Sequence, residues 1–193
     1  MTDVMKGYHG TDNSNVNSIK NNNFKKREDN NHWLGNGLYF FIDGVGESPD
    51  INAEKWAIAE SWNNQLHCYT YNVYSVLSCD IMLNKGNILN LTQVSGLNLF
   101  NKFREKLINE TDMHELKTDY SNYRSDFKLL ELLKDKFNIN IVIVHVYIKF
   151  AKQRIVRLNS RIPNCTILSV SNNTIIDKTS IKEVKRGVIE DAT

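Results

Sequence analysis

Two short stretches combine residue types that can hold a carboxamide and a flat ring. The first is Tyr8-His9-Gly10-Thr11, and the second is Gly35-Asn36-Gly37-Leu38-Tyr39-Phe40-Phe41. A glycine leaves its backbone N–H and C=O open to an amide, because no Cβ stands in the way. An aromatic face holds a flat ring by offset stacking, worth about 0.5–1.5 kcal/mol beyond burial. The two stretches therefore combine an open glycine backbone with aromatic rings.

In this order the two stretches resemble the first two signature elements of the poly(ADP-ribose) polymerase type of ADP-ribosyltransferase. The resemblance implies that His9 hydrogen-bonds the adenosine ribose of NAD and that the Gly10 backbone holds the nicotinamide carboxamide. It also implies that Tyr39 stacks on the nicotinamide ring. NAD would serve as a co-substrate, without a metal. The remaining motif residues that it places at NAD are Thr11, Gly37 and Phe40.

The third element of that family is a glutamate at the start of a late strand. The best match is Gln153-Arg154-Ile155-Val156, followed by an apolar run at Thr166–Leu168. The resemblance makes Gln153 the third catalytic candidate beside His9 and Tyr39. A glutamine can hydrogen-bond a ribose hydroxyl, but it cannot act as a base or offer a negative charge to a developing cation. Carboxylates that could substitute are Glu110, Glu115 and Asp126.

The helix after the Tyr-Phe strand supplies, in the same family, a second ring against nicotinamide and a small hydroxyl residue for its amide. Ser48 and Trp56 are the nearest candidates for these two roles. Their spacing from Tyr39 matches the family loosely.

The resemblance implies a mono-ADP-ribosyltransferase that releases nicotinamide and transfers ADP-ribose to a protein or nucleic acid. By analogy, such a chain acts as a bacterial toxin or in antiviral defence against phages, with an antitoxin or inhibitor protein as a further partner. Two alternatives remain open. One is a catalytically inactive module that binds NAD or ADP-ribose, and the other is an NAD glycohydrolase or nucleic-acid modifier.

The elements that must position these residues follow from apolar periodicity. Strands are predicted at Val4–His9, Leu38–Ile42, Val76–Leu83, Ile139–Ile148, Ile155–Leu158 and Thr166–Val170, and a further strand is indicated around Tyr69–Val73. A helix with Val16 and Ile19 on one face follows Asp12 or Asn13 as its cap, and Phe24 is expected in the core. Further helices are predicted at Asn52–Trp62, after Thr92 with apolar residues from Val94 to Leu107, and at Asp126–Phe137. Helices that do not alternate strictly with strands indicate an α+β fold.

Composition fits a single domain spanning residues 1–193, since 41% of the 193 residues are hydrophobic and 10% aromatic. The resemblance makes this domain an ADP-ribosyltransferase-like split β-sandwich with flanking helices. Three widely spaced cysteines, Cys68, Cys79 and Cys165, show no zinc spacing and are expected to be buried thiols of a reducing cytoplasm. A net charge of +2 requires neither nucleic acid nor an acidic membrane as partner, and no membrane association is expected.

Several residues near the motifs have structural as well as functional interpretations. His32 and Trp33 could shape the mouth of the pocket or anchor a loop. Aromatic and basic residues between Tyr120 and Lys128 could stack on bases, but an amphipathic helix with solvated charges explains them better. Two basic groups could attract phosphate or simply keep the surface soluble: Lys25, Lys26 and Arg27, and Arg154, Arg157 and Arg161.

Overall fold

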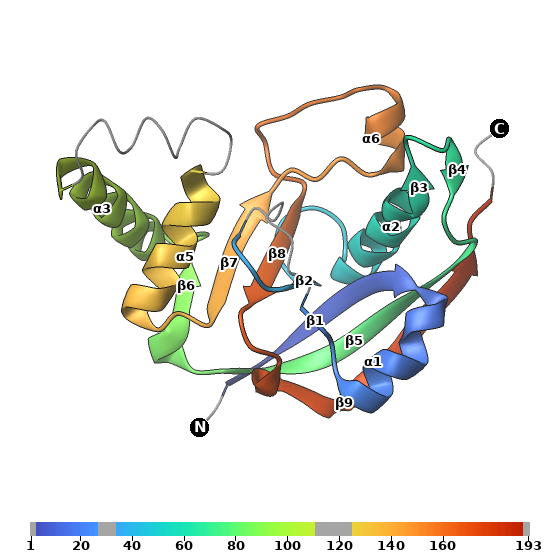
Figure 1. The fold of residues 1–193 in the computed structure, drawn as a ribbon, viewed down its shortest axis with the longest axis horizontal. Coiled ribbons are helices and arrows are strands. Elements are labelled where there is room, and N and C mark those ends of the chain that lie inside the picture. Colours follow the sequence, from blue (N-terminus) through green and yellow to red (C-terminus); the bar gives the residue numbers. More distant parts are fainter. Residues whose placement is uncertain (1–2, 27–33, 111–124, 191–193) are drawn as a thin grey trace.

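A mixed sheet of seven strands forms the centre of the computed structural model, which describes residues 3–26, 34–110 and 125–190 (Figure 1). The order across the sheet is β6-β7-β8-β2-β1-β5-β9. Strands β6 and β7 are parallel, and the other neighbours are antiparallel. The strands are β1 (Asp3–Asp12), β2 (Leu38–Ile42), β5 (Val73–Leu83), β6 (Ile88–Asn90), β7 (Ile141–Val146), β8 (Cys165–Val170) and β9 (Ile176–Val188). A separate hairpin joins β3 (Trp62–Asn63) to β4 (Cys68–Tyr69).

Five helices in the described part of the chain flank this sheet. They are α1 (Val16–Asn22), α2 (Pro49–Ser61), α3 (Val94–Glu110), α5 (Ser125–Phe137) and α6 (Ala151–Ile155). Helix α2 contacts β1, β2, β5 and β8, and so covers the middle of the sheet. Helices α3 and α5 pack on each other at the β6 end, whereas α1 lies beside β9. Three single 3-10 turns complete the description: η1 (Asn13–Asn15), η2 (Lys85–Asn87) and η3 (Asn173–Ile175).

The two faces of the sheet carry separate hydrophobic cores, because successive side chains of a strand point to opposite faces. On β2, Tyr39 and Phe41 join the core under α2, α3 and α5. Leu38, Phe40 and Ile42 join the core on the other face, together with Phe24. Phe24 is therefore buried as predicted.

Strands β1 and β2 pair over a very short stretch. Strand β1 pairs with β5 along its whole length, from Asp3↔Leu83 to Asp12↔Tyr74. In contrast, β1 and β2 share a single register pair, Tyr8↔Phe41. Beyond Tyr8 the two strands form no register pair, and the motif residues that follow it lie where this pairing ends. We call this place the opening between β1 and β2.

The mixed sheet with its irregularly placed helices confirms the α+β prediction. Strand β2 has the predicted bounds, whereas β1 extends to Asp12 and β7 is shorter than the predicted Ile139–Ile148. Helix α2 begins at Pro49, three residues before the predicted start, with Ser48 as its N-cap. Asp12 caps the turn η1 ahead of α1 through a hydrogen bond from the Ser14 backbone N–H.

Two predictions were wrong, and two strands of the seven-stranded sheet, β6 and β9, were missed. The predicted strand at Ile155–Leu158 does not form, because Ile155 ends α6 and the following residues belong to no strand. Strand β9, which pairs with β5, was not predicted. Cys79 and Cys165 are buried free thiols as expected, but the Cys68 thiol is free and exposed.

None of the helices described here is long and apolar enough to cross a membrane.

Candidate functional site

His9 and Tyr39, the central residues of the two motifs, meet through a hydrogen bond between neighbouring strands. His9 Nδ1 lies 2.9 Å from the backbone carbonyl oxygen of Tyr39. A carbonyl oxygen can only accept, so Nδ1 carries the proton and donates. In the neutral ring Nε2 is then the acceptor nitrogen, which suits a hydroxyl donor. An edge contact with Phe24 and a tilted contact with Phe40, at centroid distances of 5.2 and 5.8 Å, further fix the orientation of the His9 ring.

The two side chains lie on opposite faces of the sheet. His9 packs against Phe24 and Phe40, which belong to the core on the α1 face. The Tyr39 ring packs against the core on the α2 face and is half-buried. A ligand that contacts both must therefore span the opening between β1 and β2.

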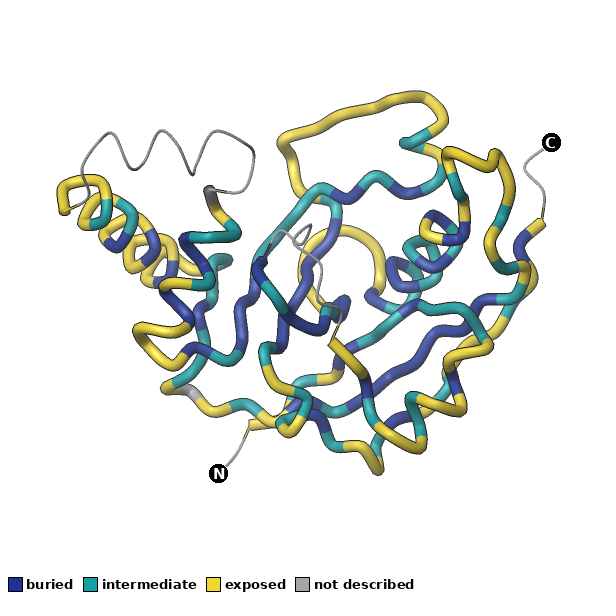
Figure 2. The backbone as a smooth tube through the Cα atoms, in the orientation of Figure 1, coloured by how far each residue is buried: buried dark blue, intermediate teal, exposed yellow. Residues whose placement is uncertain are grey.

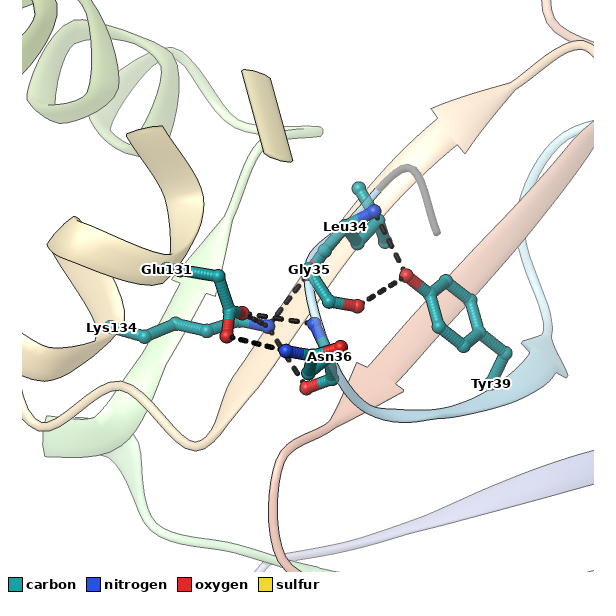
Figure 3. Close-up of polar contacts among 6 residues, drawn as sticks. All are labelled: Leu34, Gly35, Asn36, Tyr39, Glu131 and Lys134. Carbon is teal, nitrogen blue, oxygen red and sulfur yellow. Dashed lines mark hydrogen bonds and ion pairs between the residues drawn. The ribbon is translucent and has the colours of Figure 1, made fainter. Parts of the chain in front are cut away.

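The Tyr39 hydroxyl closes the glycine-containing turn before β2 (Figure 3). It accepts a hydrogen bond from the Leu34 N–H at 2.9 Å and donates one to the Gly35 carbonyl oxygen at 2.8 Å. The ring is thereby held from both ends, by its strand and by its hydroxyl. Its orientation is fixed before any ligand arrives.

Helix α5 holds the same turn from the other side (Figure 3). The ammonium group of Lys134, only 6% exposed, donates to the Leu34 carbonyl oxygen at 2.6 Å and to Glu131 Oε1 at 3.0 Å. Glu131 in turn accepts from the Asn36 backbone N–H at 3.0 Å. Burial lowers the pKa of Lys134, and the hydrogen bond and charge of Glu131 oppose that shift. Sequence reasoning missed this pair, since no spacing in the chain links α5 to a turn about 100 residues earlier.

The motif glycines are required by packing. Gly35 has a φ of +79°, and a Cβ there would lie 2.0 Å from Glu131 Oε1. A Cβ on Gly37 would lie 2.3 Å from Ser169 Oγ, and one on Gly10 would lie 1.9 Å from the Ala53 carbonyl oxygen of α2. Close approach of α2 to β1 therefore explains Gly10 independently of any ligand.

The other residues predicted to contact NAD differ in burial and in the contacts of their side chains. Phe40 is 1% exposed and lies in the core, where its side chain offers no surface to a ligand. Thr11 Oγ1 accepts a hydrogen bond from Asn15 Nδ2 at 3.2 Å. Ser48 is exposed at the start of α2 without a side-chain cap bond. Trp56 is half-buried in α2, and the Arg154 guanidinium carbon lies 5.8 Å from its ring centroid.

Gln153 lies in α6 and not at the start of a strand, which corrects the structural basis for choosing it. Its Oε1 is buried and has no hydrogen-bond partner among the described residues. The late strand that pairs with β2 is β8, and it starts at Cys165 and Thr166. No carboxylate therefore stands at the start of that strand.

The carboxylates considered as substitutes do not reach the site. Glu110 ends α3 and pairs with Lys106, and Asp126 is exposed at the start of α5. Glu115 lies outside the described residues, as do His32, Trp33, Arg27, Tyr120 and Tyr123. Glu131 is the carboxylate bonded to the glycine turn, but Lys134 and the Asn36 N–H already engage it.

A hollow of about 590 Å³ lies along α3, lined by residues from Asn98 to Glu110, and it shares no residue with the candidate site. Its walls come from a single helix, and none of the motif residues lines it. Among the residues that the structure describes, no three His, Cys, Asp or Glu side chains gather to hold a metal ion.

No family model matches the chain. An uncharacterized protein of Methanocaldococcus jannaschii is 28% identical over 108 residues, which make up 55% of this chain and 45% of the archaeal protein. The match thus spans less than half the length of that relative, whose name assigns no activity.

Proposed function

We propose that this chain binds NAD and acts as a mono-ADP-ribosyltransferase with an ADP-ribosyltransferase-like fold. The observation that carries the proposal is the hydrogen bond from His9 Nδ1 to the Tyr39 carbonyl oxygen. It joins the two motifs at the opening between β1 and β2, where the family resemblance requires a shared pocket. The narrow join at Tyr8↔Phe41 supports a sheet divided into two halves.

The placement of side chains suits a ligand with two unlike ends. His9 and Thr11 lie on one face of β1, two residues apart, and both can hydrogen-bond ribose hydroxyls. Tyr39 and Trp56 are half-buried rings packed on the core of the other face, and rings of this kind can stack on nicotinamide. We therefore assign the adenosine end of NAD to His9 and Thr11, and the nicotinamide end to the α2 face.

The chemistry would be substitution at the ribose carbon that bears nicotinamide. The bond to nicotinamide breaks with its electron pair on the leaving group, and the acceptor's nucleophile adds to the ribose carbon and loses a proton. An oxocarbenium-like centre forms between these events, so orientation of the ribose and exclusion of water contribute most. A hydrogen bond between the His9 ring and a ribose hydroxyl would supply that orientation. The acceptor would be a macromolecule.

The absence of a carboxylate at the start of β8 favours a second candidate, a module that binds NAD or ADP-ribose without cleaving it. Without a negative charge near the ribose, the developing cation loses an electrostatic source of stabilisation. This second candidate keeps the pocket and differs only in the fate of the bound NAD.

Nicotinamide release from NAD separates the two candidates, and labelled NAD incubated with protein, RNA and DNA pools identifies the acceptor. Transferase activity predicts nicotinamide release that a macromolecular pool accelerates, with label retained on that pool. Binding without release would establish the inactive module. Release with the label found only in free ADP-ribose would make water the acceptor and the chain an NAD glycohydrolase.

A further inference from the structure

The loop between α6 and β8 carries an unusual concentration of exposed apolar side chains. Ile155, Val156, Leu158 and Ile162 are 69%, 70%, 54% and 75% exposed. Residues 155–163 form a continuous exposed arc above the sheet (Figure 2). Single exposed aliphatic residues are ordinary, but four within eight residues indicate a contact surface. We call residues 155–163 the exposed arc.

The exposed arc is held in place at both ends. At its start, Arg154 donates hydrogen bonds to the carbonyl oxygens of Lys149 and Ala59 and to Glu60, at 2.7–2.9 Å. At its end, Asn164 exchanges two hydrogen bonds of 2.9 Å with the backbone of Ile148. Within it, the Ile162 N–H donates to Ser160 Oγ at 2.9 Å. The apolar side chains are therefore presented by an ordered loop.

The charged side chains of the chain segment that carries the arc have one sign. Residues 136–176 contain no aspartate or glutamate, although they include six lysines and arginines. Arg157 and Arg161 belong to the exposed arc, and Lys152 precedes it; all three are exposed. Glu60 of α2 pairs with Arg154, at the start of the arc, at 2.9 Å. The net charge of +2 for the whole chain conceals this local excess.

We propose that the exposed arc docks on an anionic lipid bilayer. Aliphatic side chains flanked by arginines suit this surface, because the former enter the acyl boundary while the latter meet lipid phosphates. The arc contains no aromatic residue, which disfavours nucleic acid, where stacked bases require rings. The energetic centres of protein interfaces are likewise enriched in tryptophan and tyrosine rather than leucine and valine. This inference does not depend on NAD binding, and it differs from the expectation that no membrane is involved.

Sedimentation with vesicles of phosphatidylcholine, with and without phosphatidylserine, tests the proposal on the full chain. The wild type should bind the vesicles that contain phosphatidylserine and should not bind the neutral vesicles. Ile162→Asp should weaken binding more than tenfold, because it removes an inserting side chain and adds a negative charge. Arg157→Gln with Arg161→Gln should weaken it about fivefold per residue.

Matched control variants distinguish the contribution of the exposed arc from general effects of surface substitution on vesicle binding. Val94→Asp changes a side chain of equal exposure, 73%, at the start of α3, where an aspartate suits the helix terminus. Lys178→Gln with Lys182→Gln removes two exposed charges from β9. Unchanged thermal unfolding of each variant verifies folding. Failure of the wild type to bind anionic vesicles would overturn the proposal, and so would equal loss in the controls, or arc-dependent binding of RNA or an acidic protein in place of vesicles.

Discussion

The ring and the hydroxyl of Tyr39 have different roles, and substitution can separate them. Tyr39→Phe keeps the ring and removes the hydroxyl that bonds Leu34 and Gly35. The turn then loses two hydrogen bonds, so we expect the free energy of unfolding to fall by about 1–3 kcal/mol while NAD affinity changes little. Tyr39→Ala also removes the ring and should abolish NAD binding. Chemical denaturation and calorimetric titration measure the two effects, and equal loss of NAD affinity in both variants would contradict a stacking role for the ring.

Substitution of Gly10 tests how closely α2 approaches β1. A Cβ at Gly10 would lie 1.9 Å from a backbone oxygen, which cannot rotate away as a side chain can. Gly10→Ala should therefore lower the free energy of unfolding by about 1–3 kcal/mol or more. Gly86→Ala is the control, since the nearest atom to its Cβ is 3.7 Å away. Similar denaturation midpoints for the two variants would show that α2 does not press on β1.

At the scale of elements, the link between α5 and the glycine turn depends on Lys134 and Glu131. Lys134→Met leaves Glu131 and the Leu34 carbonyl oxygen without their buried donor, so we expect a loss of about 1–3 kcal/mol in stability. Glu131→Gln should cost less, because its side chain is 30% exposed. Combined in one chain, the two changes should be non-additive by about 0.5–3 kcal/mol. Strict additivity in urea denaturation would mean that the two side chains do not act as a pair.

Sequence periodicity predicted the elements whose apolar side chains are buried. Strand β2 and helix α5 have strong patterns, and their bounds were predicted closely. Strand β9 escaped prediction because it is an edge strand rich in charged residues, among them three lysines, and register shifts against β5 interrupt its alternation. The aliphatic residues after Gln153 predict a buried strand, whereas their side chains are exposed.

The candidate site was predictable only where its residues lie in one motif. His9 and Tyr39 were identified from local order along the chain. Glu131 and Lys134 reach the turn through tertiary packing, which no local pattern encodes. The strand on which the choice of Gln153 depended does not form, because Gln153 lies in α6.

At the scale of the whole molecule, two buried thiols set the response to alkaline pH. Burial raises the pKa of Cys79 and Cys165 from an ordinary value of 9.0 to about 12. The unfolded chain releases these protons above pH 9 while the folded chain keeps them, so stability should fall by about 1.4 kcal/mol per pH unit for each thiol between about pH 9 and 12. The Tyr74 hydroxyl, whose pKa is raised to about 12 by burial and its bond to Glu54, adds to this fall above about pH 10.

Urea denaturation from about pH 8 to pH 10 measures this dependence. Cys79→Ala and Cys165→Ala should each flatten the alkaline slope, although each also lowers stability at neutral pH by removing buried volume. The lowered pKa of Lys134 acts in the opposite direction, because the unfolded chain then binds the extra proton below about pH 10.5. A slope unchanged by both cysteine variants would contradict the burial of the two thiols.

The central claim, that the opening between β1 and β2 holds NAD, is tested most directly by calorimetric titration of NAD into the wild type and His9→Ala. His9 belongs to this opening through its bond to the Tyr39 carbonyl oxygen, and Gly86→Ala serves as a distant control. We expect saturable binding of one NAD to the wild type and the control, and loss of binding in His9→Ala with its fold intact. Absence of binding to the wild type, or equal affinity in the folded His9→Ala variant, would contradict the account.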